Sequence, residues 1–195
     1  NTIDFSDATS GVTVYLDGTD GAGVAVAYQV MADGFGGQDI VTSVTKIIGS
    51  GFKDTLKGTS GDDVLQAGAG DDIIYYTRGL DYYDGGNHTT SSGQGSGTPS
   101  VGGGDWISLA KETTTTVNFD LYNSSVGANI TNSSATVTNI ENIIGYNGVQ
   151  ATTGWGTDSN NTFVMYAGND SIIGRQGNDV YDLGDGADAA FASYG

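Results

Sequence analysis

The sequence predicts an all-β fold in which parallel β-roll or solenoid segments with flanking β-strands form two related units. Two tracts, residues 58–84 and 165–190, carry a repeat of nine residues, which is a period of parallel β-solenoids. Residues 11–16 (GVTVYL) alternate between apolar and polar side chains, and this alternation indicates a strand with one buried face. No stretch shows helical periodicity of useful length.

Each nonapeptide of the first tract combines the same three kinds of residue. A glycine precedes an aspartate by two positions, and a large apolar or aromatic residue follows it by two. Glycine permits a turn with positive φ and leaves carbonyl groups pointing inward, and carboxylate and carbonyl oxygens are the ligands that Ca²⁺ prefers. The large residue two positions after the aspartate lies on the same face of a short strand as the aspartate, and it points into the roll. The aspartates are Asp63, Asp72 and Asp81, and the inward residues are Leu65, Ile74 and Tyr83.

The second tract repeats this pattern in register. One such tract would also fit a flexible linker rich in glycine and aspartate, whereas two tracts with the same spacing favour a roll that calcium stabilises. The aspartates of this tract are Asp170, Asp179 and Asp188, and the residues at the inward position are Ile172, Tyr181 and Ala190.

The amino-acid composition indicates which ligands and partners the protein can bind. The net charge is −17, and of the 23 acidic residues only Glu112 and Glu141 are glutamates, which leaves 21 aspartates. A short carboxylate reaches an ion beside its own backbone, so the excess of aspartate indicates ion-binding turns. Only six residues are lysine or arginine, which argues against binding to nucleic acid or to anionic membranes.

The chain contains no cysteine, so disulfides and thiolate metal sites are excluded, and calcium is the alternative staple for an extracellular protein. No apolar run approaches the roughly 20 residues of a membrane span, and no signal peptide is visible. The abrupt opening NTIDFSDATS suggests a module within a larger chain. We also expect this module to be monomeric and not to insert into a membrane.

The two tracts belong to a longer internal duplication. Each unit runs from alternating strands through an apolar stretch that ends in IIG to the nonapeptides. We therefore expect a first unit at 1–86, a Gly/Ser-rich insertion or linker at 87–104, and a second unit at 105–195, together forming one compact domain. The matched segments are 3–6 with 107–110, 11–16 with 116–121, 44–49 with 140–145, and 58–72 with 156–170.

The polar run between the units has two interpretations. It fits a mobile linker, or a long insertion within a single turn of the roll. The second interpretation is favoured because the pattern resumes in phase at Asp105, which becomes a further turn aspartate with Ile107 at the inward position.

The quoted motifs resemble those of the RTX (repeats-in-toxin) family of Gram-negative secreted proteins, and the resemblance covers most of the chain. It implies a parallel β-roll with two nonapeptides per turn and several Ca²⁺ ions between successive turns on each edge. Residues 18 apart are then expected to stack, Asp54 over Asp72 and Asp63 over Asp81 in the first tract. The implied metal-binding residues are Asp54, Asp63, Asp72, Asp81, Asp105, Asn161, Asp170, Asp179 and Asp188.

Some residues depart from the motif. Asn161 is expected to stack over Asp179, and Asp170 over Asp188, but Asn161 is neutral, so its site should be weak or empty. Met165 and Tyr166 replace two glycines, which puts that turn in doubt. Asp62 and Asp71 precede ligand aspartates and either coordinate calcium or add negative potential.

The sequence does not favour an enzyme. The single histidine, His88, lies in the Gly/Ser run, and no serine or cysteine nucleophile accompanies it. A pair of carboxylates could form a glycosidase site, but in a chain with this many aspartates such pairs occur by chance. We expect no catalytic residues.

Ligand binding has better support. Aromatic residues gather where the roll pattern degrades, and glycine N–H groups can hold an anion. A calcium with incomplete protein ligation could accept a carboxylate or sugar diol from the ligand. The alternative is that the tyrosines fill or coat the roll and that Arg78 is a counterion. The candidate ligand-binding residues are Tyr76, Arg78, Gly102, Gly103, Gly104 and Trp155.

The resemblance implies three functional readings. The first is a calcium-dependent module of a large secreted RTX adhesin that binds peptide C-termini or glycans on host or partner cells, located outside the cell or at the bacterial cell surface. The second is a non-catalytic module that assists folding and type I secretion of an enzyme or toxin. The third is a structural spacer. Each requires a chain that is unfolded at low cytosolic calcium and folds outside.

Overall fold

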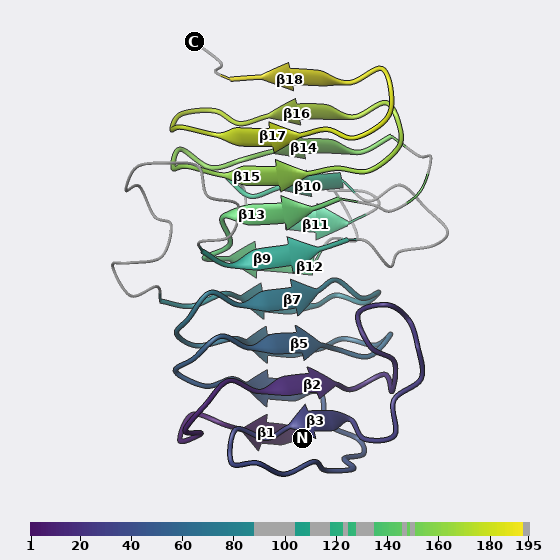
Figure 1. Ribbon diagram of the computed structural model, residues 1–195, viewed down its shortest axis with the longest axis vertical. Helices are drawn as coiled ribbons and strands as arrows, with labels where there is room; N and C mark the ends of the chain where they lie inside the picture. The colour runs from purple at the N-terminus through teal and green to yellow at the C-terminus, as the bar shows by residue number, and fades with distance from the viewer. Residues whose placement is uncertain are drawn as a thin grey trace.

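The computed structural model describes residues 1–87, 104–109, 118–122, 125–127, 135–145, 148 and 151–192. Within these residues every regular element is a short β-strand, and none is a helix. In this part of the chain there is accordingly no helix with the length and apolarity that a membrane span requires. The strands stack into a tall ladder with β1 near one end and β18 at the other (Figure 1).

The strands form two sheets, which we name sheet A and sheet B. In spatial order, sheet A contains β1 (Thr2–Asp4), β4 (Lys46–Ile48), β6 (Val64–Gln66), β8 (Tyr82–Asp84), β12 (Ala135–Thr138), β11 (Ser125–Gly127), β10 (Asn118–Asp120), β14 (Thr153–Trp155), β16 (Ser171–Ile173) and β18 (Ala189–Phe191). Sheet B contains β17 (Val180–Asp182), β15 (Thr162–Val164), β13 (Asn142–Ile144), β9 (Trp106–Ser108), β7 (Ile73–Tyr75), β5 (Thr55–Lys57), β2 (Thr13–Tyr15) and β3 (Val30–Ala32).

The nine-residue period follows directly from this arrangement. Each nonapeptide supplies a three-residue strand and the turn to the opposite sheet, so two nonapeptides complete one turn of the roll. Strands 18 residues apart therefore pair in parallel, for example Leu65 with Tyr83 in sheet A and Leu56 with Ile74 in sheet B. The predicted parallel β-roll with flanking strands is confirmed.

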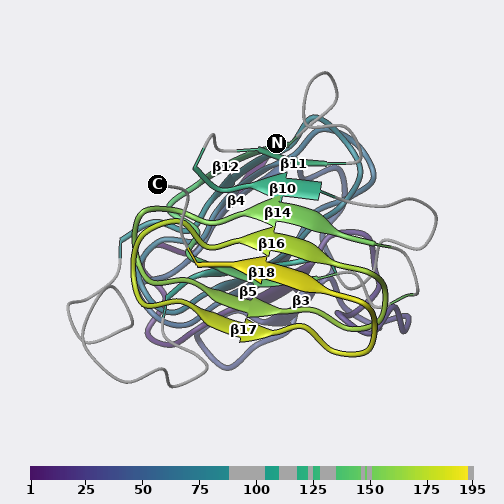
Figure 2. The ribbon, with the colours of Figure 1, turned by 90° about the horizontal axis from the view of Figure 1, so that it is seen from above.

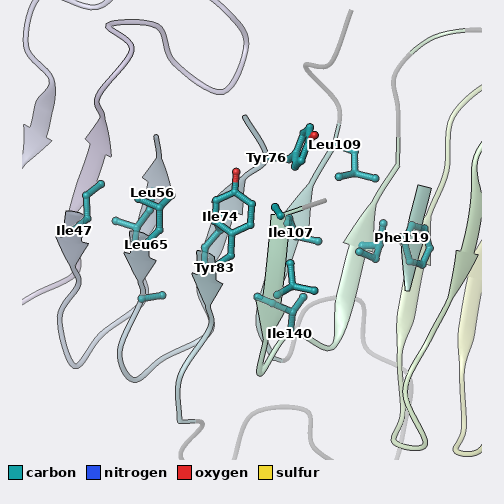
Figure 3. Packing of buried hydrophobic residues seen from close by; sticks show 14 of the residues in the cluster. Ile47, Leu56, Leu65, Ile74, Tyr76, Tyr83, Ile107, Leu109, Phe119 and Ile140 are labelled. Atoms are coloured by element: carbon teal, nitrogen blue, oxygen red, sulfur yellow. The ribbon is translucent and has the colours of Figure 1, made fainter. Parts of the chain in front are cut away.

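The core lies between the two sheets, which face each other when the molecule is viewed along its long axis (Figure 2). Because side chains alternate along a strand, only the middle residue of each three-residue strand points inward. Figure 3 shows the resulting row of side chains from Ile47 to Phe119. The inward residues that are fully buried include Ile47, Leu56, Leu65, Ile74, Tyr83, Ile107 and Ile172.

Two expected core residues are less enclosed because they lie at the end of the ladder. Tyr181 is half-buried in the terminal strand of sheet B, and Ala190 is exposed in the terminal strand of sheet A. The ring of Tyr181 still stacks on Phe163, which in turn stacks on Phe119, with centroid separations of 5.3 and 6.0 Å.

The duplicated units occupy opposite sheets. β1 and β4 of the first unit lie in sheet A, whereas the matching strands β9 and β13 of the second unit lie in sheet B. Each unit also adds antiparallel flanking structure: β3 pairs with β2, and β11 pairs with β10 and with β12. Since one nonapeptide is half a turn, the second unit is related to the first by half a turn of the roll as well as by translation.

The roll continues on both sides of the long polar run. β9, which follows that run, pairs with β7 before it and with β13 after it. Residues 88–103 themselves lie outside the described part of the chain, and so do Gly102, Gly103 and His88 among the residues considered above.

Glycines permit the close stacking of the turns. Gly68 has φ +110°, and a Cβ there would collide with the carbonyl oxygen of Ser50 in the neighbouring turn. Gly23 also has positive φ, at +75°, but an added Cβ would meet nothing within 4 Å. A substitution at Gly68 would therefore cause both backbone strain and a steric collision, whereas a substitution at Gly23 would cause backbone strain alone.

We predict that Gly68→Ala lowers the free energy of unfolding of the calcium-loaded protein by about 3 kcal/mol or more, because strain and overpacking add. Gly23→Ala should cost only about 1–2 kcal/mol, since it brings the strain alone. Urea denaturation in saturating calcium measures both. Equal losses would show that the turns do not stack as closely as described.

Candidate metal centres

The turns of the roll form two edges. We call the edge reached from sheet A the AB edge; its turns include 49–54, 67–72, 85–105, 139–141, 156–161 and 174–179. The opposite edge, reached from sheet B, is the BA edge; its turns include 58–63, 76–81, 165–170 and 183–188. The first residues of each turn continue the strand, and the last residue is an aspartate except in the turns 139–141 and 156–161, which end in Glu141 and Asn161.

A ladder of side chains runs along the AB edge. Asp72 Oδ1 accepts a hydrogen bond of 2.7 Å from the backbone N–H of Asp54, 18 residues earlier. Asp105 Oδ1 accepts from the N–H of Asp72 at 2.7 Å, across the inserted run. Glu141 Oε2 accepts from Asp105 at 3.0 Å, and Asp179 Oδ1 accepts from Asn161 at 3.0 Å. Each acidic side chain thus binds the backbone of the preceding turn.

The BA edge shows the same contact. Asp81 Oδ1 accepts from the N–H of Asp63 at 2.9 Å, and Asp188 Oδ1 accepts from Asp170 at 2.8 Å. Asp170 Oδ1 also accepts from the N–H of Thr152 at 2.7 Å. The stacking expected for residues 18 apart is therefore present on both edges.

A second ladder runs in the opposite direction. The side chain just before a ligand aspartate accepts a hydrogen bond from the following turn: Asp62 from Leu80 N–H, and Asp71 from Gly104 N–H, at 2.8 and 3.2 Å. Asparagines do the same in the second tract, where Asn160 accepts from Asn178 and Asn169 from Ala187. The pattern G-D-D or G-N-D in the sequence carried this signal. These residues link turns, a role that sequence reasoning missed.

Several ladder carboxylates are buried, and Asp63 has an oxygen that could still bind a cation. Oδ1 of Asp63 is buried without a hydrogen-bond partner, while its Oδ2 accepts from the Thr59 N–H and hydroxyl. Burial raises the pKa of Asp54, and likewise of Asp170 and Asp179. Burial also raises the pKa of Asp81 from 3.8 to about 6, although the Tyr83 hydroxyl donates to it. A hard cation would relieve this desolvation cost.

Backbone carbonyls lie close to the neighbouring turns and could supply further oxygen ligands. A Cβ at Gly79 would come within 2.5 Å of the Gly61 carbonyl oxygen, and Cβ atoms at Gly86 and Gly186 would collide with the Gly68 and Gly168 carbonyl oxygens. The carbonyls of one turn therefore lie against the next turn, at both edges. Among the described residues no cluster of three or more His, Cys, Asp or Glu side chains suitable for a metal is present. The oxygen donors that each turn offers are a carboxylate and backbone carbonyls, a combination that would suit Ca²⁺.

Comparison with known proteins agrees with this geometry. The model of the RTX calcium-binding nonapeptide repeat matches residues 48–87 and 155–189, in four copies. The chain therefore carries RTX calcium-binding nonapeptide repeats in these two segments. RTX repeats bind several Ca²⁺ ions and mark a module of a secreted Gram-negative protein, and the family is generally structural and non-catalytic. No curated protein matches the chain.

The RTX side chains predicted to bind calcium are divided between the two edges. Asp54, Asp72, Asp105, Asn161 and Asp179 lie on the AB edge, and Asp63, Asp81, Asp170 and Asp188 lie on the BA edge. Asp54 differs from Asp63 because both of its oxygens accept hydrogen bonds, from Val12 N–H and from Ser50. Which residues contact calcium remains a prediction.

Asn161 uses its amide where the other turns have a carboxylate. Its Nδ2 donates to the Glu141 carbonyl oxygen at 2.8 Å, and its Oδ1 accepts from Thr157 N–H at 2.8 Å. A side-chain N–H thus takes a carbonyl that a cation could otherwise use, and the weak or empty site at Asn161 stays a prediction. The turn that contains Met165 and Tyr166 nevertheless forms: Met165 is buried, and the Tyr166 carbonyl accepts from Asp185 N–H.

The AB edge is interrupted where the two units meet, a place that we call the seam. The turn 139–141 has three residues, whereas the turns 156–161 and 174–179 have six each, so it brings fewer carbonyls. A pocket of about 200 Å³ opens beside it. Its lining combines the buried Glu141 with hydroxyl, amide and apolar groups, from Leu121, Val137, Thr138, Asn139, Ile140, Glu141, Thr157 and Ser159.

The structure separates the ligand-binding candidates into two groups. Gly104 lies at the seam, where an added Cβ would be 3.1 Å from Glu141 Oε2. Trp155 ends β14 on the same edge, and its carbonyl accepts from Leu121 N–H. Tyr76 and Arg78 lie on the BA edge instead, so the predicted residues do not form a single site. Tyr76 is also buried, with its ring 6.4 Å from that of Tyr83, and is a core residue and not a rim residue.

Sequence reasoning missed an arginine at the rim of the seam pocket. The Arg175 guanidinium carbon lies 3.6 Å from the centroid of the Tyr122 ring, and its Nε donates to Asp158 at 3.0 Å. Asp158 lies between two residues that line the pocket, and Tyr122 follows a third. Arg175 has φ +76°. The arginine is therefore held in one orientation by a ring and an ion pair, which no local sequence signal reveals.

We predict that calcium folds this RTX module. Without metal the stacked carboxylates repel and remain desolvated, and the single row of inward side chains gives a thin core. Far-UV circular dichroism should show loss of β-structure in EGTA and recovery with calcium, at about 10⁻⁴ to 10⁻³ M for extracellular sites. An unchanged spectrum would contradict the prediction.

We also predict that the apparent calcium affinity falls as the pH drops through about 6. The folded-state pKa of Asp81 lies above the ordinary value of 3.8, so its protonated form stabilises the calcium-free fold below about pH 4, and that contribution is lost as the pH rises through about 6. Calcium requires the carboxylate, so protons compete with it in this window. Calcium titrations at pH 7.5 and 5 measure the change, and equal affinities would contradict it.

Proposed function

We propose that this RTX module is a calcium-dependent ligand-binding module of a secreted bacterial adhesin, and that it binds peptide C-termini at the seam pocket. The observation that carries the proposal is the pocket itself. It opens at the seam, where the regular carboxylate ladder of the AB edge is broken, and the buried acid Glu141 belongs to both the ladder and the pocket wall.

The residues at the seam suit a ligand that carries an anionic group together with further hydrogen-bonding groups. Asp105 and Glu141 would hold calcium there, and the ion supplies positive charge for a ligand carboxylate or diol. The Arg175 guanidinium at the rim adds a fixed positive charge, and guanidinium groups bind carboxylates through paired hydrogen bonds. Thr157 and Ser159 offer hydroxyls, and Leu121 offers an apolar wall.

A glycan ligand is the second candidate. Sugar recognition commonly combines an aromatic face with hydroxyl and amide partners, and Tyr122 is 51% exposed beside a pocket that is lined by Thr138 and Asn139. The alternative function is a non-catalytic RTX module that assists folding and secretion. In that case the seam would be only the junction between two units.

The test is thermal melting in saturating calcium with short peptides that have free C-termini, the same peptides amidated, and simple sugars. A ligand should raise the melting temperature as RT ln(1 + [L]/Kd) requires. We predict that a stabilising peptide loses its effect when amidated. A sugar hit would favour the glycan ligand, and no hit with a calcium-folded protein would favour the secretion module.

The two arginines provide a matched pair of variants. Arg175→Gln should weaken peptide binding by about 10-fold to 100-fold, because a charge-assisted hydrogen bond contributes about 1.5–3 kcal/mol. Arg78→Gln, on the opposite edge, should leave the affinity unchanged. The reverse result would place the ligand on the BA edge, near the residues that the sequence alone suggested.

A further inference from the structure

The segment Asp39–Thr42 near the start of the roll is the structural equivalent of β12. Val30 pairs with Asp39 in antiparallel fashion, as Val126 pairs with Ala135, and both members are offset by 96 residues. The residues Val41-Thr42 correspond to Val137-Thr138 of β12. The next residue has positive φ in each unit, 58° at Ser43 and 52° at Asn139.

In the second unit, this strand joins the two units. β12 pairs in parallel with β8, the last strand of the first unit, in the register Thr136 to Tyr82 and Val137 to Tyr83. The Thr136 N–H donates to the Asp81 carbonyl at 2.8 Å, and the Gly85 N–H donates to the Thr138 carbonyl at 3.0 Å. Val137 is buried by this contact, with 1% of its surface exposed.

In the first unit, the same edge is open. Within the described residues, the Ile40 N–H and the Thr42 carbonyl, which correspond to the two bonding groups of β12, make no hydrogen bond. Ile40 is 68% exposed, and Val41 is only half-buried where Val137 is buried. β1 beside it has an open edge too, and Ile3 is half-buried where the matching Ile107 of β9 is fully buried.

The other end of the roll presents the complementary groups. β17 corresponds to β8 and is the last strand of sheet B. On its open side, the Asp179 carbonyl and the Leu183 N–H occupy the places of the Asp81 carbonyl and the Gly85 N–H, and within the described residues they too make no hydrogen bond. β18, which follows Asp188 and pairs with β16, corresponds to β9, which follows Asp105 and pairs with β7.

β18 therefore stands where the first strand of another unit would stand. Its inward residue is Ala190, whereas the equivalent residues in β1 and β9 are Ile3 and Ile107. An isoleucine buries more apolar surface than an alanine, so β1 fits this position better than β18.

From this correspondence we infer that the edge formed by Asp39–Thr42 and β1 is a docking surface for the end of a second copy of this RTX roll. β17 of that copy pairs with Asp39–Thr42, and β1 takes the place of β18 on β16. The junction repeats the interface that already joins the two units within the chain. The occupant is the calcium-folded end of another unit, which extends both sheets without a break.

The test is a tandem protein in which residues 1–188 of one copy are joined to residues 2–195 of a second copy, so that Thr2 replaces Ala189. The chain has no cysteine, which allows specific crosslinking. Thr42→Cys in the second copy and Asp182→Cys in the first should react efficiently with a short bis-maleimide in calcium. The matched control carries the same two substitutions in the opposite copies, at the two outer ends, and should give no intramolecular product.

A proline variant tests the hydrogen bond itself. Ile40→Pro in the second copy removes the N–H that reaches β17 and should lower the melting temperature of the tandem protein by about 2 °C or more. Ile40→Pro in the first copy, where the edge is open, should have no such effect. Equal crosslinking of the two cysteine proteins, or equal melting of the two proline proteins, would overturn the inference.

Discussion

The regular turns of the roll depend on one contact, in which an acidic side chain accepts a hydrogen bond from the backbone N–H of the preceding turn, 18 residues earlier within the repeat tracts. This contact fixes the register of both sheets, because it places each strand beside the strand two nonapeptides away. It also gathers anions in rows along both edges. The same interaction that aligns the turns therefore creates the electrostatic cost that calcium removes.

The hydrophobic core alone does not offset the electrostatic cost of the carboxylates along the two edges. One inward residue per three-residue strand, together with buried neighbours such as Tyr76 and Leu109, gives a narrow core between the sheets, and the net charge of −17 opposes compaction. We therefore expect folding to be coupled to the ion, which would suit a secreted chain. The prediction is that the chain stays extended where calcium is scarce, and that the edges close and the strands align where calcium is abundant.

Much of the roll could be predicted from the sequence because its physical causes are local and periodic. The spacing of Asp63, Asp72 and Asp81 identified the strands, the turns and the stacked pairs. Tyr76 could also have been recognised as a core residue, since it lies two positions beyond the inward Ile74. The other aromatic residues nearby suggested a cluster at the rim of the roll, and this concealed the simple alternation.

The seam could not be predicted, because it depends on residues that no period connects. Glu141 joins the carboxylate ladder from a three-residue turn, without the glycines that mark the other turns. Arg175 meets Tyr122 across more than fifty residues of chain. The exchange of sheets between the units follows because the first unit begins with β1 in sheet A and ends with β8 in sheet A, so that the next strand, β9, begins the second unit in sheet B.

The seam shows how a repetitive fold acquires a distinctive site. A uniform roll presents the same carboxylates and carbonyls at every turn, so no turn differs chemically from the next. At the seam, two flanking strands enter sheet A alone, which moves the turns of the AB edge apart and leaves the pocket between them. The flanking segment that produces this gap also carries the edge that joins one unit to another. Extension of the roll and a pocket at each junction are therefore two consequences of one structural element, and an array of such units would carry a comparable pocket at every junction.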